Sequence, residues 1–153
     1  MRSDLFRLAY LAVCGGIYAD ADDRCRIDPT PLMPSGFDLI VLQENLGSIG
    51  NNFIAAAPAH PWIGFALNAL VTMVIEKQGD NIWFLTGPGA LSSAFCQFYQ
   101  TEFKEARLPL GVRVPTVYEL NQYISPHIPC SHKQDERNWA SQHVRQRSLF
   151  RRI

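Results

Sequence analysis

The opening segment of the chain restricts the fold more than any other stretch, because a helix, a diglycine turn, a short strand and two carboxylates follow one another directly. The helix is predicted to begin at the N-cap residue Ser3 and to end at Gly15. Between these ends the apolar residues recur at helical spacing, at Leu5, Leu8, Ala9 and Ala12. A short strand is predicted at residues 17–19, and it leads straight into Asp20 and Asp22. The D-x-D tripeptide therefore lies at the end of a strand.

The spacing of Asp20 and Asp22 suits a hard metal ion. At the end of a strand, two carboxylates at positions i and i+2 converge on one cation when the chain leaves the pleat. Oxygen ligands of this kind suit Mg²⁺ or Mn²⁺, which share their coordination sphere with waters and a substrate diphosphate. Such an ion neutralises the charge that develops on a departing nucleoside diphosphate. We therefore predict that Asp20 and Asp22 bind Mn²⁺ or Mg²⁺ and act catalytically.

Asp4 and Arg7 are predicted to face the same cleft. They are three residues apart on one helix and so share a face. The guanidinium of Arg7 suits a phosphate or a sugar hydroxyl, and Asp4 can accept hydrogen bonds from sugar hydroxyls. Gly16, in the diglycine that ends the helix, permits close approach of the backbone to a ligand.

A lone D-x-D tripeptide is more often a solvated turn, so its specificity here comes from the order of helix, diglycine, aromatic residue and D-x-D. An EF-hand is excluded, because Arg24, Cys25 and Pro31 would occupy the fifth, sixth and twelfth loop positions. The sequence contains neither a P-loop nor a nucleophile-elbow motif.

Composition is that of one globular domain. The 153 residues are 47% hydrophobic and 18% charged, and the formal net charge is zero. A chain without a basic surplus is not expected to bind nucleic acid. The four cysteines form no C-x-x-C pair, which favours a reducing, cytoplasmic location over a zinc site or a disulfide framework. No apolar run reaches the roughly 18 residues that a membrane span needs, and no signal peptide is expected.

The rest of the chain alternates between predicted strands and helices. Strands are predicted at residues 38–42, 53–57, 82–85, 112–114 and 117–120, and helices at residues 61–75 and 90–105. Gly79 is the expected C-terminal cap of the first of these helices. Residues 133–153 form a polar, arginine-rich tail, predicted to be helical. This order indicates a single α/β domain with a mixed, mostly parallel sheet.

The run S-D-L-F-R-L-A-Y-L-A-V-C-G-G-I-Y-A-D-A-D resembles the conserved segment of glycosyltransferases with a DXD sugar-binding region. That class includes fungal mannosyltransferases, glucosylating clostridial toxins and bacterial enzymes of polysaccharide biosynthesis. The later segments N-N-F-I-A-A-A-P-A-H-P and I-W-F-L-T-G-P-G extend the similarity. The resemblance implies a Rossmann-like GT-A fold and metal-dependent, generally retaining transfer of a sugar from a nucleotide sugar.

The resemblance also implies roles for individual residues. Asp4 and Arg7 would touch the donor sugar, Tyr18 would lie near the nucleoside, Asp20 would contact ribose or sugar, and Asp22 would bind the metal. Thr86 and Gly87, in the T-G-P turn, are expected to approach the donor, although a plain turn is nearly as good an explanation. Relatives close the site with a Ser-Trp pair near the C-terminus, and Trp139 is the tryptophan available here. Glu44, Asn45 and Asn52 are further candidates for acceptor contact.

The resemblance further implies that the nucleotide-binding half, roughly 60 residues in two βαβ units, precedes the D-x-D in relatives. We therefore expect this chain to lack that half and to expose a sheet edge through which it oligomerises. The expected partners are a nucleotide-sugar donor and a glycan, lipid-linked or protein acceptor. The arginine-rich tail allows peripheral membrane contact. Two alternatives stay open: a non-catalytic remnant that binds metal or sugar nucleotide, and a metal-dependent hydrolase that uses the same carboxylates.

Overall fold

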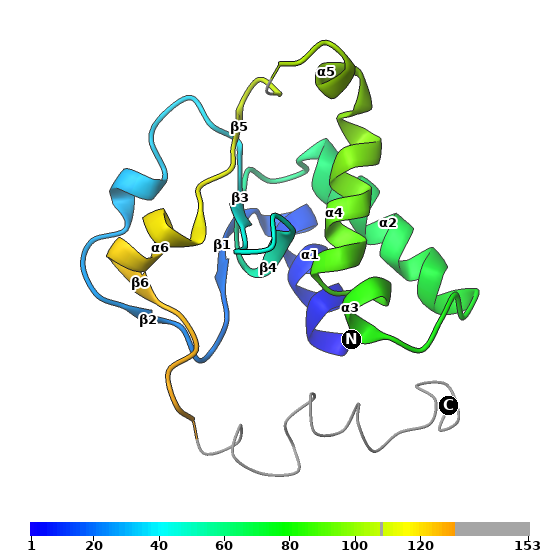
Figure 1. Cartoon of the computed structure of the whole chain (residues 1–153), viewed down its shortest axis with the longest axis horizontal. Helices are drawn as coiled ribbons and strands as arrows, with labels where there is room; N and C mark the ends of the chain where they lie inside the picture. The colour runs from blue at the N-terminus through cyan, green and yellow to red at the C-terminus, as the bar shows by residue number, and fades with distance from the viewer. Residues whose placement is uncertain (108, 131–153) are drawn as a thin grey trace.

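A computed structural model describes residues 1–107 and 109–130 as a sheet between two unequal layers of helix and loop (Figure 1). The larger layer holds α1, α2 and α4, which Figure 1 shows on one side of the sheet. The smaller layer holds η1 and α6 on the other side. The helices are α1 (Arg2–Cys14), η1 (Thr30–Leu32), α2 (Pro61–Ile75), α3 (Ile82–Leu85), α4 (Pro88–Phe98), α5 (Gln100–Lys104) and α6 (Val117–Tyr123).

The main sheet has four strands in the order β1-β4-β3-β5. These strands are β1 (Gly16–Ala19), β3 (Leu39–Gln43), β4 (Ile49–Ala56) and β5 (Val112–Arg113). β4 pairs antiparallel with both β1 and β3, whereas β3 and β5 are parallel. The short β3–β4 connection forms a hairpin, so these two strands must run antiparallel. The predicted α/β fold with a mixed sheet is confirmed. Among the described strands of the main sheet, however, two of the three pairings are antiparallel and β3–β5 is the parallel one, so the expectation of a mostly parallel sheet is wrong.

The two faces of the sheet bury separate apolar clusters because successive side chains of a strand point to opposite faces. Leu39, Val41 and Ile54 pack against α1, α2 and α4 in the larger cluster. On the other face, Ile40 and Phe53 join the smaller cluster around α6. A two-stranded sheet of β2 (Arg24–Cys25) and β6 (Ile124–Ser125) lies beside it and connects the segment after the D-x-D to the end of α6.

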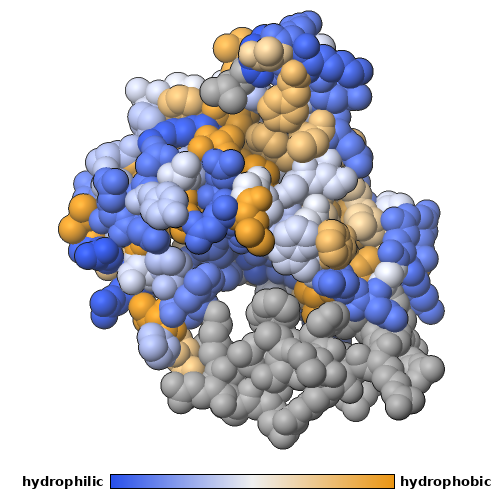
Figure 2. Space-filling view, in the orientation of Figure 1, coloured by the Kyte–Doolittle hydropathy of each residue, from blue (hydrophilic) through white to orange (hydrophobic). Residues whose placement is uncertain are grey.

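β1 is an edge strand of the main sheet, where the sequence predicts the sheet to end. Ile17 on this strand is 55% exposed. On the neighbouring helix α1, three large apolar side chains one turn apart are also exposed, namely Phe6, Tyr10 and Val13. In Figure 2, hydrophilic residues cover much of the α6 side, and apolar surface also gathers beside α4 and α5.

Two predicted strands are helices in the structure. Residues 82–85 form α3, because the side chain of Asn81 accepts a hydrogen bond from the Trp83 backbone N–H and caps a short helical turn. Residues 117–120 belong to α6, because Thr116 and Glu119 form a reciprocal capping box. The apolar alternation that favoured strands is outweighed in both places by a side-chain cap.

Several predicted boundaries also differ. α1 begins at Arg2 with Met1 as its N-cap, so the predicted capping role of Ser3 is wrong. The predicted helix 90–105 is divided into α4 and α5 at Tyr99. α2 ends at Ile75 as predicted, but its cap is Glu76 instead of Gly79. The predicted tail at residues 133–153 lies outside the described residues.

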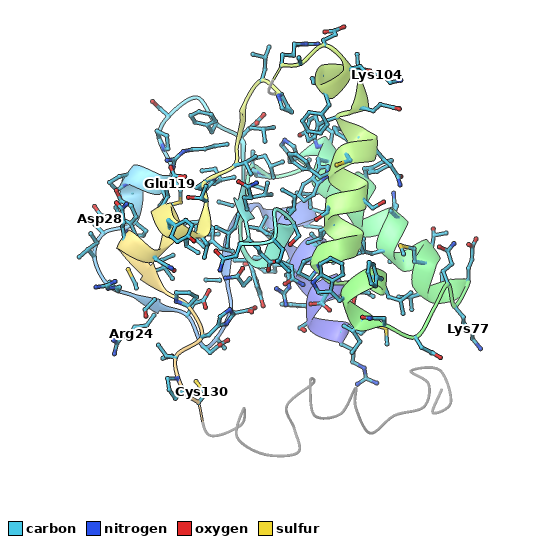
Figure 3. The ribbon with its side chains drawn as sticks, viewed as in Figure 1. Arg24, Asp28, Lys77, Lys104, Glu119 and Cys130 are labelled. Carbon is cyan, nitrogen blue, oxygen red and sulfur yellow. The ribbon has the colours of Figure 1, made fainter. Side chains whose placement is uncertain are left out.

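The capping box of α6 yields a stability prediction. Thr116 Oγ1 accepts a hydrogen bond from the backbone N–H of Glu119, and Glu119 accepts one from the backbone N–H of Thr116 at 2.7 Å (Glu119 is labelled in Figure 3). Thr116→Ala should lower the free energy of unfolding by about 0.5–2 kcal/mol in urea denaturation followed by circular dichroism. Thr116→Ser keeps the capping oxygen and should lower the free energy of unfolding much less. Equal losses in both variants would show that the cap contributes nothing.

Candidate functional site

A cavity of about 510 Å³ opens where the D-x-D tripeptide follows β1. Its walls come from α1, the end of β1, the β3–β4 hairpin, the turn from α3 to α4, and the loop after β6. The lining residues are Met1, Ser3, Asp4, Arg7, Tyr18, Asp20, Ala21, Asp22, Glu44, Asn51, Asn52, Ile82, Trp83, Gly87, Pro88 and His127. Segments far apart in the sequence therefore meet in one cleft.

Asp4 is a buried acceptor with four partners from three parts of the chain. Its Oδ1 accepts hydrogen bonds from Arg7 Nη2 at 3.0 Å and from Asn51 Nδ2 at 3.1 Å. Its Oδ2 accepts one from Thr86 Oγ1 at 2.8 Å and lies 2.8 Å from the Met1 ammonium. A carboxylate buried to this extent must be paired with cations and donors. Asp4 therefore ties α1 to β4 and to the turn before α4.

Arg7 connects Asp4 with the end of β1. It is 4% exposed, and its Nη1 donates to Asp20 Oδ1 at 3.2 Å and to the backbone oxygen of Asn51. Its guanidinium lies 4.3 Å from the centre of the Tyr18 ring, a cation–π contact. Arg7 therefore faces the cleft with Asp4, the position that the sequence predicts.

Asp20 is held by two donors from its own side of the cavity. The Tyr18 hydroxyl donates to Asp20 Oδ1 at 2.9 Å, beside the bond from Arg7. Burial raises the pKa of Tyr18 to about 12, although the nearby Arg7 charge opposes this shift. The phenol therefore stays protonated and remains a donor to Asp20.

Asp22 lies in a second group of ligands, with Asp23 and His127. One ligand atom from each residue lies within 4.8 Å of the other two. His127 Nδ1 is 3.4 Å from Asp22 Oδ2, and the His127 backbone N–H donates to Asp23 Oδ1 at 3.3 Å. Asn52 Nδ2 donates to Asp23 Oδ2 at 3.4 Å. Burial raises the pKa of Asp23, against these two hydrogen bonds, which lower it.

The chain is similar in sequence to known proteins. Residues 1–47 match the family described as a glycosyltransferase sugar-binding region containing a DXD motif. The chain is 28% identical over 129 residues to the mannosyl phosphorylinositol ceramide synthase SUR1 of Saccharomyces cerevisiae, covering 80% of this chain and 32% of that protein.

Over its first 47 residues the chain resembles glycosyltransferases with a DXD-containing sugar-binding region.

A solved structure supports the fold of this chain. The PaToxG glycosyltransferase matches it with a TM-score of 0.50 and 24% identity, covering 95% of this chain and 52% of that chain. The chain thus spans about half of that structure and about a third of the Saccharomyces cerevisiae relative. No helix among the described residues is long and apolar enough to cross a membrane.

The structure brings together most of the residues that the glycosyltransferase resemblance singles out. Asp4, Arg7, Tyr18, Asp20, Asp22 and Gly87 line one cavity, together with the candidate acceptor residues Glu44 and Asn52. Thr86 is fully buried and bonded to Asp4. Gly16 lies at the other end of β1, where it lines a separate groove beside Ile17 and Phe37. Trp139 lies outside the described residues.

Sequence reasoning missed His127 and Asp23. His127 is more than a hundred positions from the D-x-D, and it reaches Asp22 because β6 pairs with β2, the strand that follows the D-x-D. The backbone N–H of Ile128 also donates to the Asp22 carbonyl at 2.8 Å. A single histidine after a proline carries no sequence pattern of its own. Asp23, the neighbour of Asp22, would have been found by counting every carboxylate that follows β1.

The buried ion pairs of Arg7 yield a second prediction. Arg7→Met removes the cation between Asp4 and Asp20 and should lower the free energy of unfolding by about 3–5 kcal/mol, because buried carboxylates lose their partner. The matched control is Arg2, on the exposed part of the same helix. Arg2→Met should change the free energy of unfolding by no more than about 0.5 kcal/mol. Urea denaturation measures both. Equal effects would mean that the network does not depend on Arg7.

Proposed function

We propose that this chain forms the metal-binding, catalytic part of an enzyme that moves a sugar from a nucleotide-sugar donor to a hydroxyl acceptor. The observation that carries the proposal is one cavity lined both by the Asp4–Arg7–Asp20 network and by Asp22 and His127, which form a possible cation-binding cluster with Asp23. The first group supplies fixed donors and acceptors for a sugar and its phosphates. The second supplies ligands for a divalent cation.

The donor set of the second group fits Mn²⁺ or Mg²⁺. Two carboxylates favour a hard cation, and the imidazole nitrogen of His127 makes Mn²⁺ the better match. Asn52 and the His127 backbone orient Asp23, which is the supporting role that outer residues take at metal sites. When bound, the ion neutralises the charge that develops on the leaving nucleoside diphosphate. Asp20, held by Arg7 and Tyr18, contributes to orientation of the donor in this proposal.

Asp4 and Arg7 are proposed to hold the donor sugar. Asp4 Oδ1 is occupied by Arg7 and Asn51, which fixes the guanidinium in the cavity wall. Oδ2 accepts a hydrogen bond from Thr86 Oγ1 and lies beside the Met1 ammonium, and in this proposal it is the oxygen that accepts from a sugar hydroxyl. Such fixed groups hold the anomeric carbon near the acceptor oxygen and stabilise an oxocarbenium-like transition state. Retention by front-face attack of the acceptor is our proposal for the stereochemical course.

A lipid-linked acceptor is proposed from the named activity of the Saccharomyces cerevisiae relative, which is a ceramide-lipid synthase. Glu44 and Asn52 line the cavity and are the proposed contacts with the acceptor. Ser48 Oγ donates to Glu44 Oε2 at 2.6 Å, which holds the carboxylate in place. The cytoplasmic location and the peripheral membrane contact stay predictions.

We further propose that strands from a segment outside these 153 residues complete the sheet beside β1. The support is the edge position of β1, the exposure of Ile17 and of the apolar stripe on α1, and the partial coverage of both relatives. An open strand edge beside apolar surface also favours association of chains. If no such segment exists, the alternative of a non-catalytic, metal-binding module becomes the better account.

The metal site is tested with Mn²⁺ and the nuclear magnetic resonance spectrum of the chain. Paramagnetic broadening should centre on Asp22, Asp23 and His127 and should strengthen when a nucleoside diphosphate is added, since three protein ligands alone are few for this ion. Asp22→Asn should abolish the broadening. His127→Ala should weaken it more than Asp20→Asn does, because Asp20 is occupied by Arg7 and Tyr18.

The matched control is Asp28→Asn. Asp28 is an exposed carboxylate that accepts hydrogen bonds from Thr30, and Figure 3 shows it at the outer side of the loop before η1. This variant should leave the broadening unchanged. Broadening that survives in Asp22→Asn would contradict the metal assignment. If Asp20→Asn reduces the broadening more than His127→Ala does, the metal ligands are the two aspartates of the D-x-D instead.

A transfer assay tests the need for further strands. The purified 153-residue chain should transfer sugar only very slowly, because in this proposal the base and ribose contacts that orient the donor come from the added strands. The measurement is release of nucleoside diphosphate from a nucleotide sugar, with and without an acceptor. Rapid transfer or hydrolysis that Asp22→Ala abolishes would contradict this prediction and show a self-sufficient enzyme.

A further inference from the structure

The turn from α3 to α4 gives the cavity a wall unlike the others. Four residues of this turn line the cavity, namely Ile82, Trp83, Gly87 and Pro88, and none of them carries a charge. The remaining walls carry the carboxylates, amides and guanidinium described above. Trp83 is half-buried and is the largest side chain of this apolar wall.

The indole of Trp83 is held in place by its neighbours. A Cβ atom added at Gly89 would lie 2.4 Å from Cζ3 and 2.5 Å from Cε3 of the indole, so only glycine leaves room for the ring on α4. The Phe84 ring meets it edge to face, with centroids 4.6 Å apart. The Trp83 backbone N–H is bound by the Asn81 side chain at 2.9 Å. A ring fixed in this way loses little conformational entropy when a ligand stacks on it.

Trp83 lies close in the structure to the residues that are proposed to bind sugar hydroxyls. Thr86, one turn further along, donates to Asp4 Oδ2 at 2.8 Å, so α3 is tied directly to the Asp4–Arg7 network. A pyranose ring has hydroxyls around its rim and C–H groups on its faces. The hydroxyls of the sugar bind best to polar groups, and the C–H face of its ring binds best to an apolar surface. Small-molecule sites usually offer both kinds of surface.

We propose that Trp83 is a stacking platform for a pyranose ring whose hydroxyls face Asp4 and Arg7. This role rests on the proposed glycosyltransferase function and makes Trp83 a specificity-determining residue of it. A sugar placed in the cavity without Trp83 would keep its polar contacts but lose its apolar one. The pyranose belongs to the donor or to the acceptor, and the probes below distinguish the two.

The test compares the complete wild-type chain with Trp83→Leu, Trp83→Phe and Tyr118→Leu in the presence of Mn²⁺. Leucine keeps apolar volume without an aromatic face, whereas phenylalanine keeps a smaller face. Tyr118 is the matched control, an exposed aromatic residue on α6 that does not line the cavity. The probes are UDP, GDP, UDP-glucose, GDP-mannose and methyl α-mannoside, titrated by calorimetry and by tryptophan emission. Circular dichroism checks that each variant is folded.

Trp83→Leu should weaken binding of a nucleotide sugar about three- to tenfold, the range expected for one aromatic contact. Binding of the matching nucleoside diphosphate should not change, because it does not involve the sugar. Trp83→Phe should recover part of the loss, Tyr118→Leu should match wild type, and the sugar-dependent change in emission should disappear in Trp83→Leu. A loss confined to methyl α-mannoside would support the platform and assign it to the acceptor.

Two outcomes overturn the role of Trp83 and are distinguishable from each other. If all variants bind nucleotide sugars and methyl α-mannoside as wild type does, or if Trp83→Leu loses nucleoside diphosphate equally, the stacking role is wrong while the proposed function stands. If wild type binds none of the five probes, the proposed function is wrong and the stacking role falls with it.

Discussion

The buried ion pairs of Arg7 are the interaction on which the rest of this site depends. Two carboxylates, Asp4 from the same helix and Asp20 from the end of β1, lie within 3.2 Å of its guanidinium. Removing three charged groups from water costs free energy that offsets most of their mutual attraction, so the network adds little to the net free energy of folding. Its effect is geometric. Each charge needs the others in place, and the helix, the strand and the turn before α4 therefore keep one relative position.

The walls of the cavity differ in chemical character. The Arg7 side presents fixed hydrogen-bonding groups, the side of Asp22 and His127 presents ligands for a cation, and the turn around Trp83 presents an apolar face. A nucleotide sugar combines these chemistries: hydroxyls, a metal-binding diphosphate and the C–H faces of a ring. The two aspartates of the D-x-D have different neighbours, because Asp20 contacts Arg7 and Asp22 contacts His127.

Elements with a strong periodic pattern were predictable from the sequence. α1, β1, β3 and α2 follow from apolar spacing and from glycine or proline at their ends, since local packing and local propensity agree there. α3 and α6 were predicted as strands, because their apolar residues fit either period. Both segments are helical because the preceding residue caps the helix. The side chains of Asn81 and Thr116 each accept a hydrogen bond from a backbone N–H of the first turn.

The sequence by itself determined the resemblance to DXD glycosyltransferases, the order of helix, diglycine, strand and D-x-D, and the placement of Asp4 and Arg7 on one helix face, because all of these are local. Only the tertiary structure decided which acidic and histidine side chains lie together and which residues form each wall of the cavity. His127 reaches Asp22 through the pairing of β2 with β6, and Trp83 enters the cavity because Gly89 leaves room for its ring. Contacts between segments so distant in the chain depend on strand pairing and packing, which have no local pattern.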